Sequence, residues 1–394
     1  MQRALRYVSV GTAVRGRRMA QRLRYGGRQP SVCDDVAEWA ARHQQATAVP
    51  LLAPRPVTRR PPHTIEPSVL PEYTSRMTAT QHGRYLVPVH DARIVGREGL
   101  VILPDNSYAA EYAYGPKRLR TLSDYRAPRR QRTVHKTGSY FPLLVMPFAS
   151  PWNYYHWLHD TMMRYSGVAD VLPDDTRIVV SPNLAPFQRE TLRRVGIPDE
   201  RLVTFDAREV WELETLYFTA PASNPHNSRS EPCAWLADTL RRAFGVTDTT
   251  PRRRLFLSRR DADLRRIVNE DAVEGLLRDH GFETIVPSEL DLGEQVATFA
   301  AAEAVVAPHG AALTNILFAP SGTTVVEFID PQFASNANTY WSLSEALDHE
   351  YWYFLAESVA APRSQPDLHV PLDKLEATLA RALRRPLAEP TAPS

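Results

Sequence analysis

Apolar residues form short strand-like runs that alternate with helix-like stretches from about residue 150 onward. In the first series, RIVVS at 177–181 precedes the helical pattern PFQRETLRRVG at 186–196. In the second, LFLS at 255–258 and AVVAP at 304–308 are each followed by a helical pattern. Strands that alternate with helices predict parallel α/β units. The polar, turn-rich segment at 247–254 marks the boundary between the two series.

The chain before residue 150 follows other patterns. Residues 50–71 contain seven prolines, which exclude regular helix and predict an extended linker. Three apolar runs between residues 83 and 110 are separated by turn residues and predict a small β-meander. The sequence therefore predicts four parts: a basic arm with a proline-rich linker (1–71), an N-terminal α/β domain (72–246), a C-terminal α/β domain (247–360), and a C-terminal helix with a tail (361–394).

Length and composition limit the class of protein. The 394 residues are 43% hydrophobic and 23% charged, which is typical of a folded protein of about two domains. No stretch reaches the roughly 20 apolar residues that a membrane span needs. Cys33 and Cys233 are the only cysteines, and no secretory pattern accompanies them, which favours a reducing compartment. We therefore expect a cytoplasmic protein without a disulfide scaffold.

Positive charge is concentrated at the N-terminus. Residues 1–30 contain eight arginines and no acidic residue, whereas the whole chain has 47 basic and 45 acidic residues, so the rest of the chain is acidic. Such an arm could be a solvated extension, a presequence, or a peripheral contact with an anionic membrane at its inner face. Because lysine is nearly absent, arginine is used throughout, and arginine counts alone support no function.

A polar stripe follows one side of the helix predicted at 151–167. An imidazole is the usual general base for a hydroxyl group, and an adjacent carboxylate can fix its tautomer. Trp152 and Trp157 flank the stripe, and aromatic rings suit the apolar face of a sugar. The solvent-exposed face of a surface helix would show the same spacing and is the simpler interpretation of that spacing alone. The stripe consists of Asn153, His156, Asp160 and Arg164.

The second series contains features typical of phosphate binding. The turn at 309–311 lies between a strand and a helix, where parallel α/β sheets bind ligands and a helix start offers N–H groups. Arg259 and Arg260 directly follow another strand, and guanidinium groups bind phosphate through paired hydrogen bonds. Glu327 lies in an apolar strand and could accept from a ribose hydroxyl or pair with a core arginine. A tightly packed turn and a solvated basic loop are the alternatives.

Motifs of several enzyme classes are absent from the sequence. HExxH, CxxC, GxSxG, Walker A and an EF-hand loop do not occur. The single DxD motif, at 261–263, lies between arginines that would compete with a divalent cation. The sequence therefore predicts neither a metal nor another cofactor, and it disfavours common hydrolases and P-loop kinases.

Three blocks, in this order, resemble the family 61 glycosyltransferases, whose bacterial members are described as capsular polysaccharide biosynthesis proteins. The blocks are NYYHWLHD at 153–160, LFLSRRDADLRRIVNED at 255–271 and VVAPHGAALTNILFAPSGTTVVEF at 305–328. The resemblance extends over roughly residues 85–355. It implies the GT-B arrangement, in which two Rossmann-like domains face each other across a cleft, with the acceptor bound on the N-terminal side.

The resemblance also implies an activity. It implies an inverting transfer from a nucleotide-sugar donor to a glycan or polysaccharide hydroxyl, without an obligatory metal. His156 or Asp160 would be the base, with Asn153 beside them, and Trp152 and Trp157 would contact the acceptor. Positive charge would stabilise the departing diphosphate. The candidate donor-binding residues are Arg259, Arg260, His309, Gly310, Ala311, Asn315 and Glu327.

Two other functions fit parts of the sequence. A nucleotide-sugar epimerase can share the two-domain cleft and a histidine near the diphosphate. A binder of anionic polymers could use the arm and the basic stretch at 117–136. Nucleic acid is not an expected partner, because the basic stretches lack aromatic residues at stacking intervals and the rest of the chain is acidic.

Overall fold

The computed structural model describes residues 31–45, 47–97, 99–122, 125, 131–144, 152–222, 227–262, 264–359 and 366–383. The predicted basic arm at 1–30 and the predicted start of the helix at residue 151 lie outside these residues. Within them, no helix combines the length and the apolar character needed to cross a membrane.

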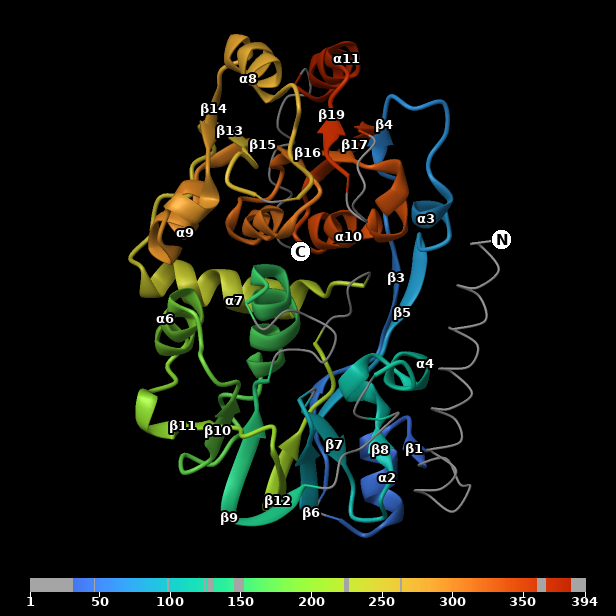
Figure 1. The fold of residues 1–394 in the computed structure, drawn as a ribbon, viewed down its shortest axis with the longest axis vertical. Coiled ribbons are helices and arrows are strands. Elements are labelled where there is room, and N and C mark those ends of the chain that lie inside the picture. Colours follow the sequence, from blue (N-terminus) through green and yellow to red (C-terminus); the bar gives the residue numbers. More distant parts are fainter. Residues whose placement is uncertain are drawn as a thin grey trace, which may run out of the picture.

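The chain forms two α/β units arranged along the long axis of the molecule (Figure 1). The N-terminal unit is built on a nine-stranded sheet in which β2 (Val49–Leu52) pairs with β6 outside the main path. The order along that path is β1 (Val32–Cys33), β8 (Tyr108–Ala109), β7 (Leu100–Ile102), β6 (Arg84–Val95), β12 (Glu209–Phe218), β9 (Arg132–Pro142), β10 (Arg177–Val180) and β11 (Leu202–Thr204).

This first sheet is mixed rather than parallel throughout. Strands β6, β7 and β8 are antiparallel neighbours, which confirms the predicted meander. Strand β6 also pairs antiparallel with β12, whereas β12, β9, β10 and β11 pair in parallel. The α/β class is therefore confirmed, but the N-terminal unit is not a purely parallel sheet. Its helices are α2 (Val36–Arg42), α4 (Pro116–Leu119), α6 (Pro186–Arg194) and α7 (Ser230–Ala243).

The C-terminal unit is a six-stranded sheet in which every pairing is parallel. The strand order is β14 (Phe282–Ile285), β13 (Arg253–Leu257), β15 (Ala302–Pro308), β16 (Thr324–Ile329), β17 (Glu350–Leu355) and β4 (His63–Thr64). The chain runs from β13 outward to β14 and then returns to β15 on the other side of β13. The connection therefore reverses between β13 and β15, and such a switch point is where open α/β sheets bind ligands.

Helices cover both faces of this second sheet. Alternate strand residues face opposite sides: Leu255 and Val305 pack with one set of helices, and Phe256 and Val306 with the other. Burial on both faces explains why these strands are continuous apolar runs. The helices are α9 (Leu292–Ala300), η6 (Ala311–Phe318) and α10 (Asn338–Ala346) on the first face, and α8 (Glu270–Asp279) and α11 (Leu372–Ala382) on the second.

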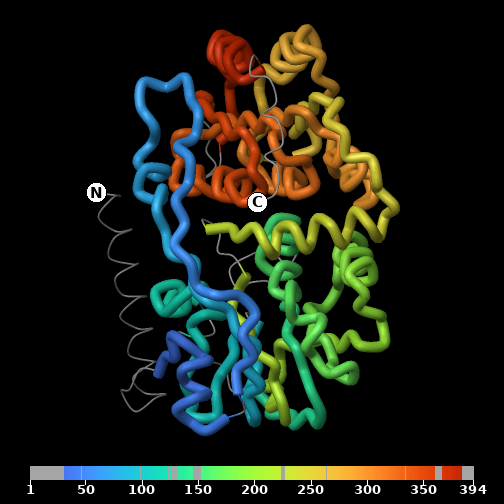
Figure 2. Tube along the Cα trace, turned by 180° about the vertical axis from the view of Figure 1, so that it is seen from behind, coloured from blue at the N-terminus to red at the C-terminus, as the bar shows by residue number. Residues whose placement is uncertain are grey.

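The proline-rich segment belongs to both units, contrary to the prediction of a separate linker. Strand β2 joins the first sheet, and β4 adds the edge strand to the second by pairing with β17. Between them, β3 (Arg55–Thr58) and β5 (Thr78–Gln81) form an antiparallel pair that runs from one unit to the other (Figures 1 and 2). The prediction is wrong for this segment because prolines exclude helix but are tolerated at edges of sheets.

The two units share one hydrophobic core. The buried ring of Tyr73, in α3 (Pro71–Thr74), packs between Trp341 and Tyr353, at centroid distances of 5.3 and 4.7 Å. Helix α7 crosses the middle of the molecule (Figure 1) and contacts α6 and η3 (Met162–Tyr165) on one side and α9 and η6 on the other. One cluster of buried residues therefore continues from Phe141 in the first sheet to Phe299 in α9.

Candidate active site

Two histidines face one cavity of about 600 Å³ at the junction of the units. His156 comes from the N-terminal unit, and His309 follows β15 in the C-terminal unit. The cavity brings together the predicted base and part of the predicted donor site. It is lined by Arg76, Tyr114, Arg118, Asn153, Tyr155, His156, Arg265, His309, Gly310, Ala311, Asn336, Thr339 and Tyr340.

His156 is held by Asp160. Its Nδ1 forms a short hydrogen bond with Asp160 Oδ2, and the backbone N–H of His156 donates to Asn153 Oδ1 at 3.1 Å. Burial would raise the pKa of Asp160, but hydrogen bonds from His156 and His159 outweigh it and lower the pKa to about 2. Asp160 is therefore ionised at neutral pH. Because an ionised carboxylate only accepts, Nδ1 carries the proton and the basic lone pair lies on Nε2.

The polar stripe is not a solvated helix face. The segment forms a π-helical turn, η2 (His156–Thr161), followed by the 3₁₀ turn η3 (Met162–Tyr165), instead of a regular α-helix. Asp160 is 0% exposed and Arg164 is buried, with its guanidinium over the ring of Tyr112 at 5.0 Å. Of the stripe, only His156, with 21% of its side chain exposed, and Asn153 reach the cavity. π-Helical turns recur at functional sites.

His309 is held in a similar way by Glu327. Its Nδ1 lies 2.5 Å from Glu327 Oε1, and Tyr351 donates to the other carboxylate oxygen at 2.5 Å. The Tyr73 hydroxyl continues this chain at 3.0 Å from that of Tyr351. Burial and the charge of Glu327 raise the pKa of Tyr351 well above its usual value, so that its hydroxyl remains a donor. Glu327 is fully buried and positions His309, so the expected contact with ribose is wrong.

Arg259 and His309 lie together at the switch point, as expected for one phosphate-binding wall. A guanidinium nitrogen of Arg259 lies so close to Gly310 that a Cβ atom on that residue would clash with it. The same guanidinium donates to the carbonyls of Leu264 and Arg265, at 3.0 and 3.2 Å. Burial, followed by the charge of Arg265, lowers the pKa of Arg259 to about 10, so that it remains a cation at neutral pH.

Arg260 points away from this wall. Its side chain donates to Ser258 Oγ at 3.1 Å and forms ion pairs with Glu274 and Glu270 of α8. The prediction that Arg260 binds the donor is therefore wrong, because consecutive residues after the strand diverge.

Three other predicted residues do not reach the cavity. Asn315 is buried, accepts from Tyr154 at 2.7 Å and donates to Gln295 at 2.8 Å, so it joins the two units instead of binding a ligand. Trp157 is wholly within the core, which contradicts an acceptor contact. Trp152 is 59% exposed and donates to the carbonyl of Asn183 at 3.1 Å, and it does not line this cavity.

The cavity contains cations that sequence reasoning missed. Arg265 donates to the carbonyl of His309 at 3.1 Å and adopts a left-handed backbone with φ of 56°, a conformation that non-glycine residues adopt mainly where the structure imposes it. Arg76 follows α3, and Arg118 lies in α4. Only Arg265 belongs to one of the quoted sequence blocks. Arg118 lies in the basic stretch at 117–136, which was not assigned to the active site, and no local signal marked Arg76.

A larger pocket of about 1250 Å³ lies on the other side of the 309–312 turn. Arg259 and Ala312 line it beside the loops that follow β13 and β14. Phe187 of α6 and Leu290 contribute apolar walls. The pocket is somewhat larger than the roughly 300 to 1,000 Å³ of most small-molecule sites and has both polar and apolar walls. The turn separates it from the cavity of the two histidines.

Among the residues with described positions, no three histidine, cysteine or acidic side chains come together as a metal site. The acidic groups nearest the cavity, Asp160 and Glu327, are each bound to histidine and to a further donor.

Comparison with known proteins connects this geometry to an enzyme family. Residues 154–326 match the family described as Glycosyltransferase 61. The matched segment contains His156, Asp160, Arg259 and His309, and it ends one residue before Glu327. A search of curated proteins finds no match to the chain. The matched segment thus contributes both histidines and the arginine of the switch point, and the match supports a family 61 glycosyltransferase.

Proposed function

We propose that this glycosyltransferase moves a sugar from a nucleotide-sugar donor to a hydroxyl of a glycan or polysaccharide, with inversion at the anomeric carbon. The observation that carries the proposal is the cavity in which a histidine on an ionised carboxylate faces the cationic switch point of a parallel sheet. In this arrangement the two units act as in a GT-B enzyme, with the acceptor on the N-terminal side.

His156 is the general base in this proposal, and Asp160 orients it. Asp160 is buried and has a pKa of about 2, so it neither reaches an acceptor nor holds a proton at neutral pH. The acceptor oxygen attacks the anomeric carbon as His156 Nε2 takes its proton. The bond from that carbon to the diphosphate oxygen breaks on the opposite face, and a single displacement of this kind inverts the configuration.

The donor is assigned to the two pockets on either side of the 309–312 turn. The nucleoside takes the larger pocket, and the transferred sugar enters the cavity of the histidines. Arg259, Arg265 and the backbone N–H groups that begin η6 face the diphosphate between them. These groups supply positive charge where negative charge develops on the leaving group. We propose that they do so without an obligatory metal, which a transfer assay in excess EDTA tests.

The acceptor and cellular role follow from the family resemblance. A capsular, exopolysaccharide or other cell-surface glycan is the acceptor class we propose. Synthesis would take place in the cytoplasm, with residues 1–30 available for peripheral contact with the inner face of an anionic membrane.

A donor panel tests the activity directly. Thermal shift with nucleoside diphosphates and nucleotide sugars selects the donor, and nuclear magnetic resonance then follows its fate. A transferase slowly releases nucleoside diphosphate in the absence of acceptor, and its product has an inverted anomeric signal. Recovery of an isomeric donor would indicate an epimerase, and no donor binding would indicate a polymer-binding protein.

A further inference from the structure

We propose that His159 is a positioning residue that fixes the Asp160 carboxylate and, through it, the base His156. The proposal rests on the proposed role of His156. Asp160 accepts on both oxygens: His156 Nδ1 contacts Oδ2, and His159 Nδ1 lies 2.9 Å from Oδ1. The carboxylate thus bridges two imidazoles, of which only that of His156 lines the cavity.

The second imidazole is immobilised on all sides. It is fully buried, its Nε2 lies 2.9 Å from Ser228 Oγ, and it stacks on Tyr155 with ring centroids 4.7 Å apart and planes 15° apart. Nδ1 donates to the ionised carboxylate, so Nε2 of the neutral imidazole is a hydrogen-bond acceptor. The Ser228 hydroxyl is the donor to it. The Ser228 backbone N–H in turn donates to Ser342 Oγ at 2.7 Å.

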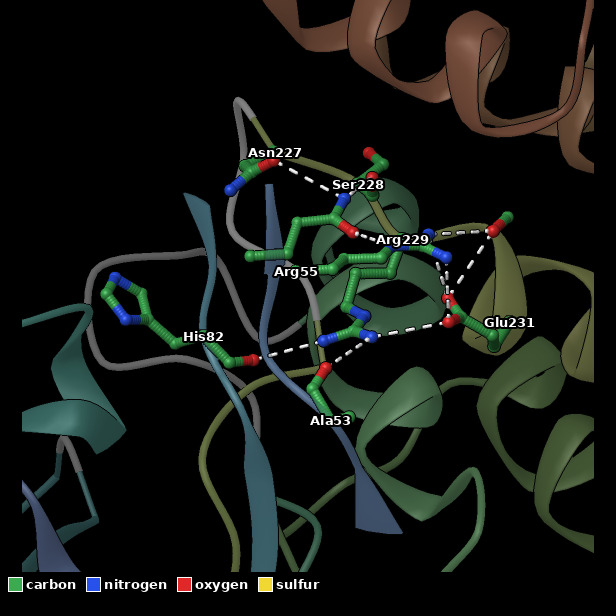
Figure 3. Close-up of polar contacts among 9 residues, drawn as sticks. Ala53, Arg55, His82, Asn227, Ser228, Arg229 and Glu231 are labelled. Atoms are coloured by element: carbon green, nitrogen blue, oxygen red, sulfur yellow. Dashed lines mark hydrogen bonds and ion pairs between the residues drawn. The ribbon is translucent and has the colours of Figure 1, made fainter. Parts of the chain in front are cut away.

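The Ser228 anchor is tied to the strands that join the two units. Gln81 donates to the Ser228 carbonyl at 2.8 Å, and Arg55 donates to Gln81 at 2.8 Å. Arg55 and Arg229 converge on Glu231, with contacts of 3.1 and 3.3 Å (Figure 3). The segment that holds His159 is therefore fastened to β3 and β5.

These contacts control the direction of the base. A carboxylate bound by one donor can rotate about its terminal bond, and His156 would turn with it. A donor on the second oxygen opposes that rotation. Catalytic groups must be held within about 0.5 Å of the productive geometry, and a misplacement of about 1 Å can cost about 100-fold in rate. His159 therefore affects turnover without touching either substrate.

Two substitutions separate the two nitrogens of His159. In His159→Asn, the amide nitrogen can take the place of Nδ1 and still donate to Asp160. In His159→Gln, the longer amide takes the place of Nε2, and the donor to Asp160 is lost. With the donor selected by the panel, we expect His159→Gln to lower kcat for donor hydrolysis about 10- to 100-fold with little change in KM, and His159→Asn to remain within about fivefold of wild type.

His349→Asn is the matched control. His349 is also fully buried but lies just before β17 and lines neither pocket, so its loss should lower thermal stability and leave kcat unchanged. If His159→Gln does not fold, Ser228→Ala tests the same anchor and should lower kcat by about threefold or more.

Two results would overturn the proposal. The first is a wild-type kcat in His159→Gln, or in Ser228→Ala if His159→Gln does not fold. The second is an equal loss of kcat in His159→Gln and His159→Asn. If His156→Ala also retains turnover, the proposed base itself is wrong. An inactive His156→Ala beside an active His159→Gln rejects the positioning role alone.

Discussion

His156 and His309 each contact a fully buried carboxylate through Nδ1, but the residues around them differ. The carboxylate of His156 is held from behind by a third imidazole, and Asn153 and Tyr155 line the cavity beside it. The carboxylate of His309 is held by the hydroxyl of Tyr351, which in turn contacts that of Tyr73, and the histidine lies beside Arg259 and Arg265. The same pair of groups is therefore set in two surroundings: beside His159, Asn153 and Tyr155 it suits a base, and beside Arg259 and Arg265 it suits the binding of an anion.

The largest expected effect tests the base. His156→Ala should lower turnover by roughly 10²- to 10⁴-fold, the usual contribution of general base catalysis, with donor affinity nearly unchanged. Turnover is measured as nucleoside diphosphate released, and affinity by calorimetry on the same preparation. Wild-type turnover in this variant would mean that His156 is not the base and that the two histidines do not have the different roles proposed.

Arg259→Ala tests the anion side of the comparison. Loss of a charge-assisted hydrogen bond should weaken nucleoside diphosphate binding by about 1.5 to 3 kcal/mol, measured by calorimetry. The neighbouring Arg260→Ala is the control, because Arg260 pairs with Glu274 and Glu270 away from the cavity. Equal weakening in both variants would contradict the assignment of the phosphate wall.

The charge of Asp160 can be tested through stability. Its pKa of about 2 in the folded protein lies below the value of about 3.9 in an unfolded chain. The ionised carboxylate therefore stabilises the fold above about pH 4, and this contribution of about 2 kcal/mol is lost as the pH falls from about 4 to 2. Urea unfolding should show this loss in the wild type, and a correspondingly smaller one in Asp160→Asn. Parallel curves for the two proteins would mean that Asp160 does not titrate as a hydrogen-bonded carboxylate.

Gly310→Ala tests the close contact between Gly310 and Arg259 at the switch point. The new Cβ would displace the Arg259 guanidinium, so we expect diphosphate affinity to fall about tenfold, a loss of about 1.4 kcal/mol. Gly275→Ala in α8 is the control, because a Cβ there meets nothing within 4 Å and alanine favours helix. Unchanged affinity in Gly310→Ala would show that Arg259 can move without consequence.

The C-terminal sheet could be predicted from sequence because its strands are buried on both faces. LFL at 255–257 and AVVAP are apolar runs, TVVEFI is apolar apart from Thr324 and Glu327, and each occurs in a strand. The turn after β15 was identified for the same reason, since a polar turn that follows a buried strand can only lie at the carboxyl end of that strand. Strand β4 was missed because its pairing with β17 depends on residues far apart in the chain.

Side-chain direction could not be predicted from local spacing. Asp160 and Arg164 follow a polar period but are buried, because the helix they occupy lies inside the core shared by the two units. Arg259 and Arg260 are adjacent in sequence, yet one faces the switch point and the other faces α8. Arg76 and Arg118 reach the cavity from separate segments, and only the tertiary fold brings them together.

The pairing of β4 with β17 has a consequence for how the chain folds during synthesis. His63 and Thr64 leave the ribosome almost 290 residues before their partners Trp352 and Tyr353. The edge strand of the second sheet therefore cannot pair until most of the chain has been synthesised, although N-terminal regions generally begin to fold first. Contacts so distant in sequence slow folding, and until β17 is made the waiting strand remains available for pairing with another chain. Proteins halted before residue 350 should accordingly be prone to aggregate.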